Sequence, residues 1–111
     1  MEVRAKNQKT AELMGDEKGL RRAFGKKIAL CIMERISMLQ ALDNLEQASK
    51  IRHFRFHQLS GNRQGQWAIK LDENNRMIII ETSHSTCPPP GTRNLRDIKS
   101  VTIIELCIDY H

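Results

Sequence analysis

Residues 66–81 read QWAIKLDENNRMIIIE, and this stretch decides the fold of the chain. Residues 66–71 alternate between polar and apolar side chains, and residues 76–81 are rich in β-branched side chains. Both patterns are typical of β-strands. The polar residues 72–75 between them have the composition of a turn. Because a short turn joins the two strands, we predict an antiparallel hairpin.

Further strands are predicted on both sides of this hairpin. Residues 53–59 alternate with period two, and residues 101–108 form an apolar run that also reads as a strand. Residues 2–6 could form a short first strand, whereas residues 82–99, with three consecutive prolines, are irregular. The sheet is therefore predicted to be a twisted antiparallel meander of about four strands.

The first half of the chain is predicted to be helical from Thr10 to about Ala48. Gly15 breaks a short first helix, Asp16 can cap the next one, and Gly19 and Gly25 favour a further kink or break. Polar residues 43–50 are predicted to end the helical half. One apolar stripe recurs at helical spacing: Leu20, Phe24, Ile28, Cys31, Ile32, Ile36, Leu39 and Leu42.

These elements predict an α+β fold in which N-terminal helices pack on one face of the sheet. A length of 111 residues favours a single domain over residues 1–111. Its helical half spans about 8–50 and its sheet half about 52–111. The other face of the sheet is left open.

The composition favours a polyanionic partner. Lys and Arg total 18 against 13 acidic residues, a net charge of +5, which suits RNA, DNA, an acidic protein or an anionic membrane surface. No apolar stretch has the length of a membrane span, and the start of the chain does not resemble a signal peptide. We therefore expect a cytoplasmic protein with no membrane contact.

The cysteines do not indicate a disulfide framework or a metal site. Cys31, Cys87 and Cys107 are far apart and lack a C-x-x-C spacing. Cys31 and Cys107 read best as small core residues. His84 and Cys87, with His111, are too irregularly spaced for a good ligand set. We expect neither a metal nor a cofactor.

Several side chains of the sheet half could handle protons or phosphates. In an extended strand His53, Arg55 and His57 would share the open face, while Phe54 and Phe56 would face the helices. Residues 109–111 (Asp-Tyr-His) follow the last predicted strand. They can accept a proton, donate one or hold a phosphate.

Three motifs resemble those of HigB-type toxins in the RelE/ParE superfamily. Residues 57–69, HQLSGNRQGQWAI, are similar to the pattern H-x-L-x-G-x-R-x-G-x-W-x-I of that family. Residues 75–76 resemble its N-W-R element, and residues 109–111 match its Asp-Tyr-His ending. The chain departs from the family at Ser60, where some members have Lys. It also lacks the aromatic residue before Arg76, and its segment 82–100 is longer than in the smallest members.

The resemblance implies a RelE-like fold and a type II toxin that cuts messenger RNA in the ribosomal A site without a metal. It implies a HigA-like helix-turn-helix antitoxin as partner, with operator DNA bound only through that antitoxin, in the bacterial cytoplasm. The catalytic residues it implies are His57, Arg76, Asp109, Tyr110 and His111. Candidate contacts with RNA or the ribosome are Arg55, Arg63, Lys18, Arg21, Arg22, Lys26 and Lys27.

Other functions remain open at this point. A ParE-like toxin that binds DNA gyrase would share the fold without nuclease chemistry. An attenuated homologue that still binds antitoxin is a second alternative, and a basic RNA-binding domain without catalysis is a third. His57 and Arg76, together with residues 110–111, favour the nuclease, because a gyrase binder has no need of them.

Overall fold

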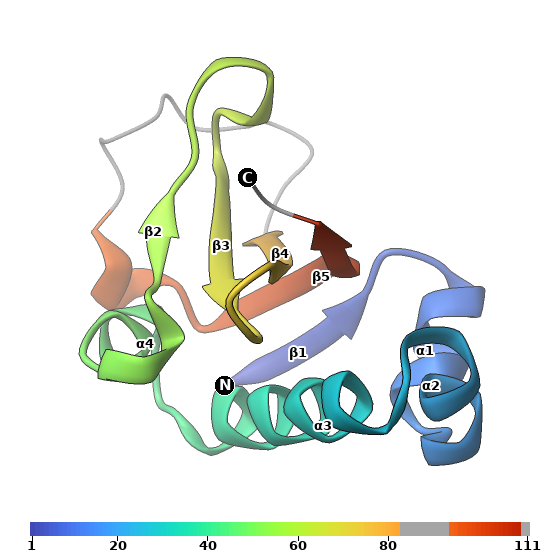
Figure 1. The fold of residues 1–111 in the computed structure, drawn as a ribbon. Helices are drawn as coiled ribbons and strands as arrows, with labels where there is room; N and C mark the ends of the chain where they lie inside the picture. The colour runs from blue at the N-terminus through green and yellow to red at the C-terminus, as the bar shows by residue number, and fades with distance from the viewer. Residues whose placement is uncertain (83–93, 110–111) are drawn as a thin grey trace.

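The computed structural model describes residues 1–82 and 94–109 as helices, strands and connecting segments (Figure 1). The strands are β1 (Glu2–Ala5), β2 (His57–Gln58), β3 (Gln66–Lys70), β4 (Asn75–Glu81) and β5 (Ser100–Asp109). The α-helices are α1 (Gln8–Met14), α2 (Glu17–Phe24), α3 (Lys26–Ala41) and α4 (Leu45–Ser49). Three 3-10 turns are η1 (Arg52–Phe54), η2 (Gly61–Arg63) and η3 (Leu95–Asp97).

The strands form one sheet in the order β1-β5-β4-β3-β2. The predicted antiparallel meander is confirmed for β2 to β5. The short first strand is also present, but it pairs with β5 in parallel. The sheet is therefore mixed and five-stranded rather than purely antiparallel. The fold class, helices on one face of a twisted sheet in an α+β domain, is as predicted.

The helix boundaries follow from side-chain caps and one glycine. Asp16 caps α2 by accepting a hydrogen bond of 3.0 Å from the Gly19 amide, as the sequence predicted. Gly25 separates α2 from α3. Its backbone has φ +88°, a conformation that few residues other than glycine adopt, so glycine is favoured at this break. The α-helical half ends within residues 43–50, as predicted, but this polar stretch itself forms the short helix α4, which Asn44 caps through the Gln47 amide.

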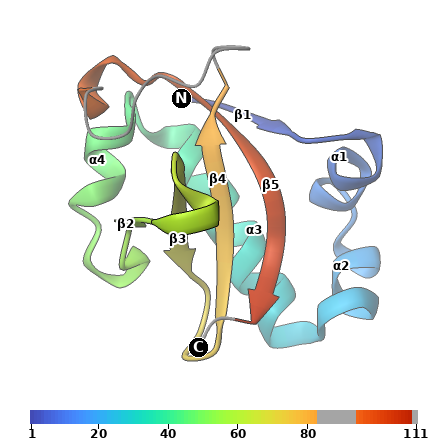
Figure 2. The same cartoon turned by 90° about the horizontal axis from the view of Figure 1, so that it is seen from above.

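The main core lies between α3 and the sheet, and in the view from above the strands cross in front of α3 (Figure 2). Ile32 and Leu39 from α3 are fully buried there, together with Ile69 and Ile79 from the sheet. The apolar stripe of the sequence supplies this helical side. Cys31 and Cys107 pack at its periphery, in agreement with their prediction as small apolar residues.

The opposite face of the sheet carries a much smaller apolar cluster. Leu59, Ala68 and Ile78 are buried there, with Ile104 and Ile108 partly buried against them. The pairing of β5 with β4 shifts register twice, between Arg76 and Ile78 and again between Ile78 and Ile79. Such irregularities bend a strand and re-aim its side chains. No described helix covers this face, which we call the open face.

Residues 53–59 do not form the predicted strand. Arg52–Phe54 is a 3-10 turn, Arg55 adopts the left-handed conformation with φ 47°, and only His57–Gln58 is extended. Phe54 is nevertheless fully buried, and Phe56 stacks on Trp67 with ring centroids 6.1 Å apart. The alternation of residues 53–59 therefore reflects the packing of the two aromatic rings, which this backbone achieves without being extended.

In residues 1–82 and 94–109, no helix combines the length and the apolar character that crossing a membrane demands. Most of the irregular segment predicted between 82 and 99, including His84 and Cys87, lies outside the described residues.

Candidate functional site

His57 lies on the open face, because it pairs with Ala68 of the open-face cluster. Its Nδ1 atom is 2.9 Å from the carbonyl oxygen of Arg55. A carbonyl only accepts hydrogen bonds, so Nδ1 carries the proton of this contact. The lone pair of the neutral imidazole is therefore at Nε2, the nitrogen that could act as a base. The left-handed turn at Arg55 holds the ring in this orientation.

Arg76 lies on the same face, opposite Lys70 on β3 and Ile108 on β5. Its Nη1 atom donates to the carbonyl oxygens of Asp72 and Asn75, at 2.8 and 2.9 Å. The guanidinium is thus held against the turn between β3 and β4. This geometry fixes a positive charge at the hairpin end of the open face.

Asp109 is exposed at the end of β5, opposite Asn75 and one ladder position beyond the pair of Arg76 with Ile108. Nearby, the Cys107 thiol donates to Asn75 Oδ1 at 3.4 Å. Burial raises the pKa of this thiol, and the charges of Asp72 and Asp109 add to the rise. The predicted catalytic residues Tyr110 and His111 lie outside the described residues.

The structure brings Asp109 and Arg76 close together and leaves His57 further away. β4 and β5 are neighbours in the sheet, whereas β2 is separated from β4 by β3. Strands lie about 4.8 Å apart, so the backbone of His57 is roughly 10 Å from β4 across the sheet. His57 and Arg76 share the open face, whereas Asp109 pairs with Asn75, which alternates with Arg76 along β4. By this register Asp109 belongs to the other side of the ladder at the end of β5, so the three residues do not form a compact triad.

Arg63 braces the connection between β2 and β3. Its guanidinium donates to Gln66 Oε1 at 2.9 Å and pairs with Glu105 Oε2 at 3.2 Å. Its positive charge is therefore largely compensated within the protein. A role for Arg63 in RNA binding stays a prediction.

The predicted basic group of the helices is exposed but is not one patch at the sheet. Lys18, Arg21 and Arg22 belong to α2, and Arg21 pairs with Glu17 at 3.4 Å. Lys26 and Lys27 begin α3. Of this group, only Lys27 reaches the lining of the cleft described next.

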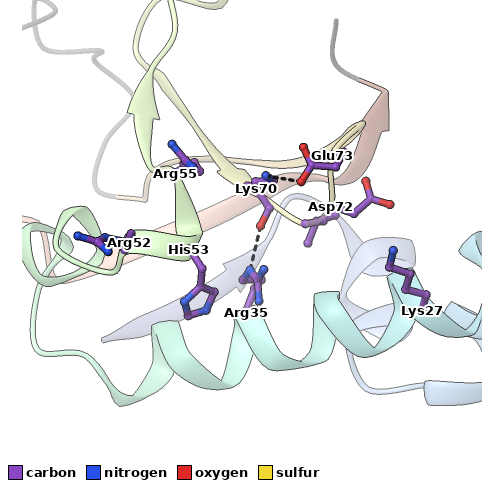
Figure 3. A pocket seen from close by; sticks show the side chains of 9 residues that line it. Lys27, Arg35, Arg52, His53, Arg55, Lys70, Asp72 and Glu73 are labelled. Carbon is purple, nitrogen blue, oxygen red and sulfur yellow. Dashed lines mark hydrogen bonds and ion pairs between the residues drawn. The ribbon is translucent and has the colours of Figure 1, made fainter.

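A cleft of about 440 Å³ lies between α3, η1 and the turn between β3 and β4 (Figure 3). Two of its lining residues, Arg55 and Lys27, are among the predicted RNA contacts. Sequence reasoning missed the rest of its basic lining. The run Arg52 to Arg55 could have indicated part of this basic lining. Arg35 could not, because nothing in the sequence distinguishes it from other polar residues of a helix. The full lining is Lys27, Arg35, Arg52, His53, Arg55, Lys70, Leu71, Asp72 and Glu73.

Two hydrogen-bonded acids shape the edge of this cleft. Asp72 Oδ1 accepts from the Asn74 and Asn75 amides and from Asn75 Nδ2, each at 2.9 Å. Burial alone would raise the pKa of Asp72, but these hydrogen bonds hold it below its usual value. The hydrogen bond from Lys70 lowers the pKa of Glu73. Among the described residues, no three His, Cys, Asp or Glu side chains form a group that could hold a metal ion.

Neither a protein-family model nor a curated protein matches the sequence. In structure, the chain is similar to the YoeB/ParE toxin from Agrobacterium tumefaciens, with a TM-score of 0.53 and 10% sequence identity. The likeness covers the whole of both chains. At this identity it establishes the fold alone, and the protein shares the α+β fold of that toxin. It does not by itself assign an activity.

Proposed function

We propose that the protein is a HigB-type toxin that cuts messenger RNA in the ribosomal A site. The observation that carries the proposal is the oriented imidazole of His57 on a sheet face that also presents Arg76, with Asp109 at the end of the neighbouring strand. The toxin fold and the three HigB-like motifs support the same function. The role requires a bacterial cytoplasm and a HigA-like antitoxin, which would also connect the complex to operator DNA.

The proposed reaction is attack of a ribose 2′-oxygen on the adjacent phosphorus. A base takes the 2′-hydroxyl proton, the bond from phosphorus to the 5′-oxygen breaks, and an acid protonates that leaving oxygen. The products are a cyclic phosphate and a free 5′-hydroxyl. A fixed cation stabilises the charge that builds on the phosphate oxygens.

The side chains have matching roles. His57 can exchange a proton through Nε2, and Arg76 supplies the cation at the hairpin end of the same face. Asp109, Tyr110 and His111 complete the proposed acid–base set. Which histidine acts as base and which as acid is left open. The proposal needs residues 110–111 on this same face.

The test is induced expression of the wild type and of His57→Ala and His111→Ala in bacteria, followed by mapping of messenger RNA 5′ ends. Each substitution should lower cleavage at least about 100-fold and relieve growth arrest. Gln58→Ala is the matched control, because Gln58 is exposed on the same strand but pairs with Trp67 of the covered face. Equal toxicity of all four proteins would refute the assignment.

A ParE-like toxin would give a different result in the same experiment. Growth would stop while messenger RNA stayed intact, and purified protein would inhibit DNA gyrase. The similarity to a structure described as a YoeB/ParE toxin makes this the second candidate. An attenuated, antitoxin-binding homologue would show neither effect.

A further inference from the structure

The basic cleft is assembled from segments far apart in the sequence. Lys27 and Arg35 come from α3, Arg52 and Arg55 from the region of η1, and Lys70 from the end of β3. Figure 3 shows Arg35 rising from α3 toward the backbone of Lys70, with Lys27 further along the same helix. Five Lys or Arg side chains therefore line one hollow, against two carboxylates.

Both carboxylates of the lining already have hydrogen-bond donors. Asp72 accepts from its own turn, and Glu73 pairs with Lys70 at 2.9 Å. Within the part of the chain that the structure describes, Lys27, Arg52 and Arg55 make no ion pair. Arg35 pairs with Glu34 and Lys70 with Glu73, so the excess positive charge of the cleft comes from Lys27, Arg52 and Arg55, against Asp72.

Arg35 gives the cleft a rigid floor. The residue is 6% exposed, and its Nε atom donates to the Lys70 carbonyl at 2.9 Å. Its guanidinium also lies over the Phe54 ring, with 5.5 Å between the guanidinium carbon and the ring centroid. The guanidinium also pairs with Glu34, so Arg35 contributes a fixed, partly compensated donor group that does not have to be ordered when a ligand binds.

Arg55 connects the cleft with the open face. Its carbonyl oxygen accepts the hydrogen bond that orients His57, while its side chain lines the cleft. The turn between β3 and β4 forms the other link, because Asp72 belongs to the cleft and also accepts from Arg76 through its carbonyl oxygen. Through Arg55 and Asp72, the cleft is therefore adjacent to the groups that orient His57 and Arg76.

We propose that the cleft binds the phosphodiester backbone of the RNA strand whose cleaved linkage lies on the open face. This inference rests on the proposed nuclease function and adds a second RNA subsite to it. Arginine forks and lysine ammonium groups match phosphate oxygens. An acidic protein is less well suited, because Leu71 is the only apolar residue of the lining and protein interfaces need a buried apolar centre.

The test compares two double variants with equal loss of charge. Lys27→Ala/Arg52→Ala removes two cations of the cleft, and the control Lys6→Ala/Lys9→Ala removes two exposed cations outside it that are not among the predicted RNA contacts. The probe is a fluorescent single-stranded RNA with 2′-O-methyl groups, which cannot be cleaved. Affinity is measured by fluorescence anisotropy across a series of salt concentrations. Thermal unfolding of each variant verifies its fold.

The cleft variant should bind at least about tenfold more weakly than the wild type, and the control variant within about threefold. The salt slope of the cleft variant should fall by roughly 0.7 for each phosphate that the protein no longer neutralises. Equal weakening in both variants, no weakening, or no RNA binding by the wild type would overturn the proposal. So would a cleft variant that loses only antitoxin affinity. Because the RNA is uncleavable, failure here is distinguishable from failure of the nuclease assignment.

Discussion

The two faces of the sheet differ in how they are covered. On the covered face, α3 buries a continuous aliphatic core that includes Ile32, Ile69 and Ile79 with no exposed surface. On the open face, three buried residues form a small cluster, and the ladder positions around it hold an imidazole and a guanidinium. The same strands supply both faces, since their side chains alternate.

This contrast separates stability from function. Substitutions on the covered face should unfold the protein, whereas substitutions of polar groups on the open face should leave it folded and change what it does. The loss of activity proposed for His57→Ala is informative only under this condition. The following predictions test the separation in order of decreasing effect on stability.

The largest effect is expected for Ile79→Ala. Removing a fully buried side chain opens a cavity in the covered core and should cost about 2–5 kcal/mol. The matched variant Ile104→Ala, on a partly buried residue of the open face, should cost under about 1.5 kcal/mol. Urea denaturation of both variants measures the difference. Equal losses would show that the open face contributes to stability as much as the covered one.

An intermediate effect is expected for Arg35→Ala, at the border between the core and the cleft. The substitution leaves the Lys70 carbonyl without its donor and removes packing on Phe54, at a cost of about 1–3 kcal/mol. Arg35→Met keeps much of the stem and should recover part of the loss. If both variants were as stable as the wild type, the guanidinium would not contribute to the stability of the fold.

The smallest effect is expected for Asp72→Asn at the hairpin turn. Its folded pKa lies below the usual value of 3.8, so its ionisation stabilises the protein fully above about pH 4. That contribution is lost as the pH falls through 3.8 toward the folded pKa. The variant should lose under about 1 kcal/mol at about pH 7. Its stability should also fall less steeply between about pH 5 and 3 in thermal melts, and an unchanged slope would contradict the prediction.

Local signals in the sequence were enough for most elements. Asp16 as a cap, Gly25 as a break and the hairpin of residues 66–81 depend on neighbouring residues and are confirmed. Gly19, predicted together with Gly25 as a site of a kink or break, lies inside α2. The parallel pairing of β1 with β5 joins Glu2 to Ser100. No local pattern records such a partner, so the short first strand was predicted but its parallel pairing with β5 was not.

The candidate site was predictable only in part, for the same reason. A period-two pattern at residues 53–59 indicated burial of Phe54 and Phe56, but it could not distinguish a strand from a 3-10 turn followed by a left-handed residue. The placement of His53 and Arg55 beside His57 on one strand face was therefore wrong, and both line the cleft instead. The cleft itself depends on Arg35 and Lys70 meeting across the fold.

The interior position of β5 has a consequence for biosynthesis. This strand separates β1 from β4, although it is the last described strand to be synthesised. On a nascent chain β1 has no neighbour to pair with until residues 100–109 have emerged. Pairing over so long a sequence separation raises the contact order and slows folding. We expect the helices and the β3–β4 hairpin to form first. In the final, cooperative step β5 then pairs with β1 on one side and with β4 on the other.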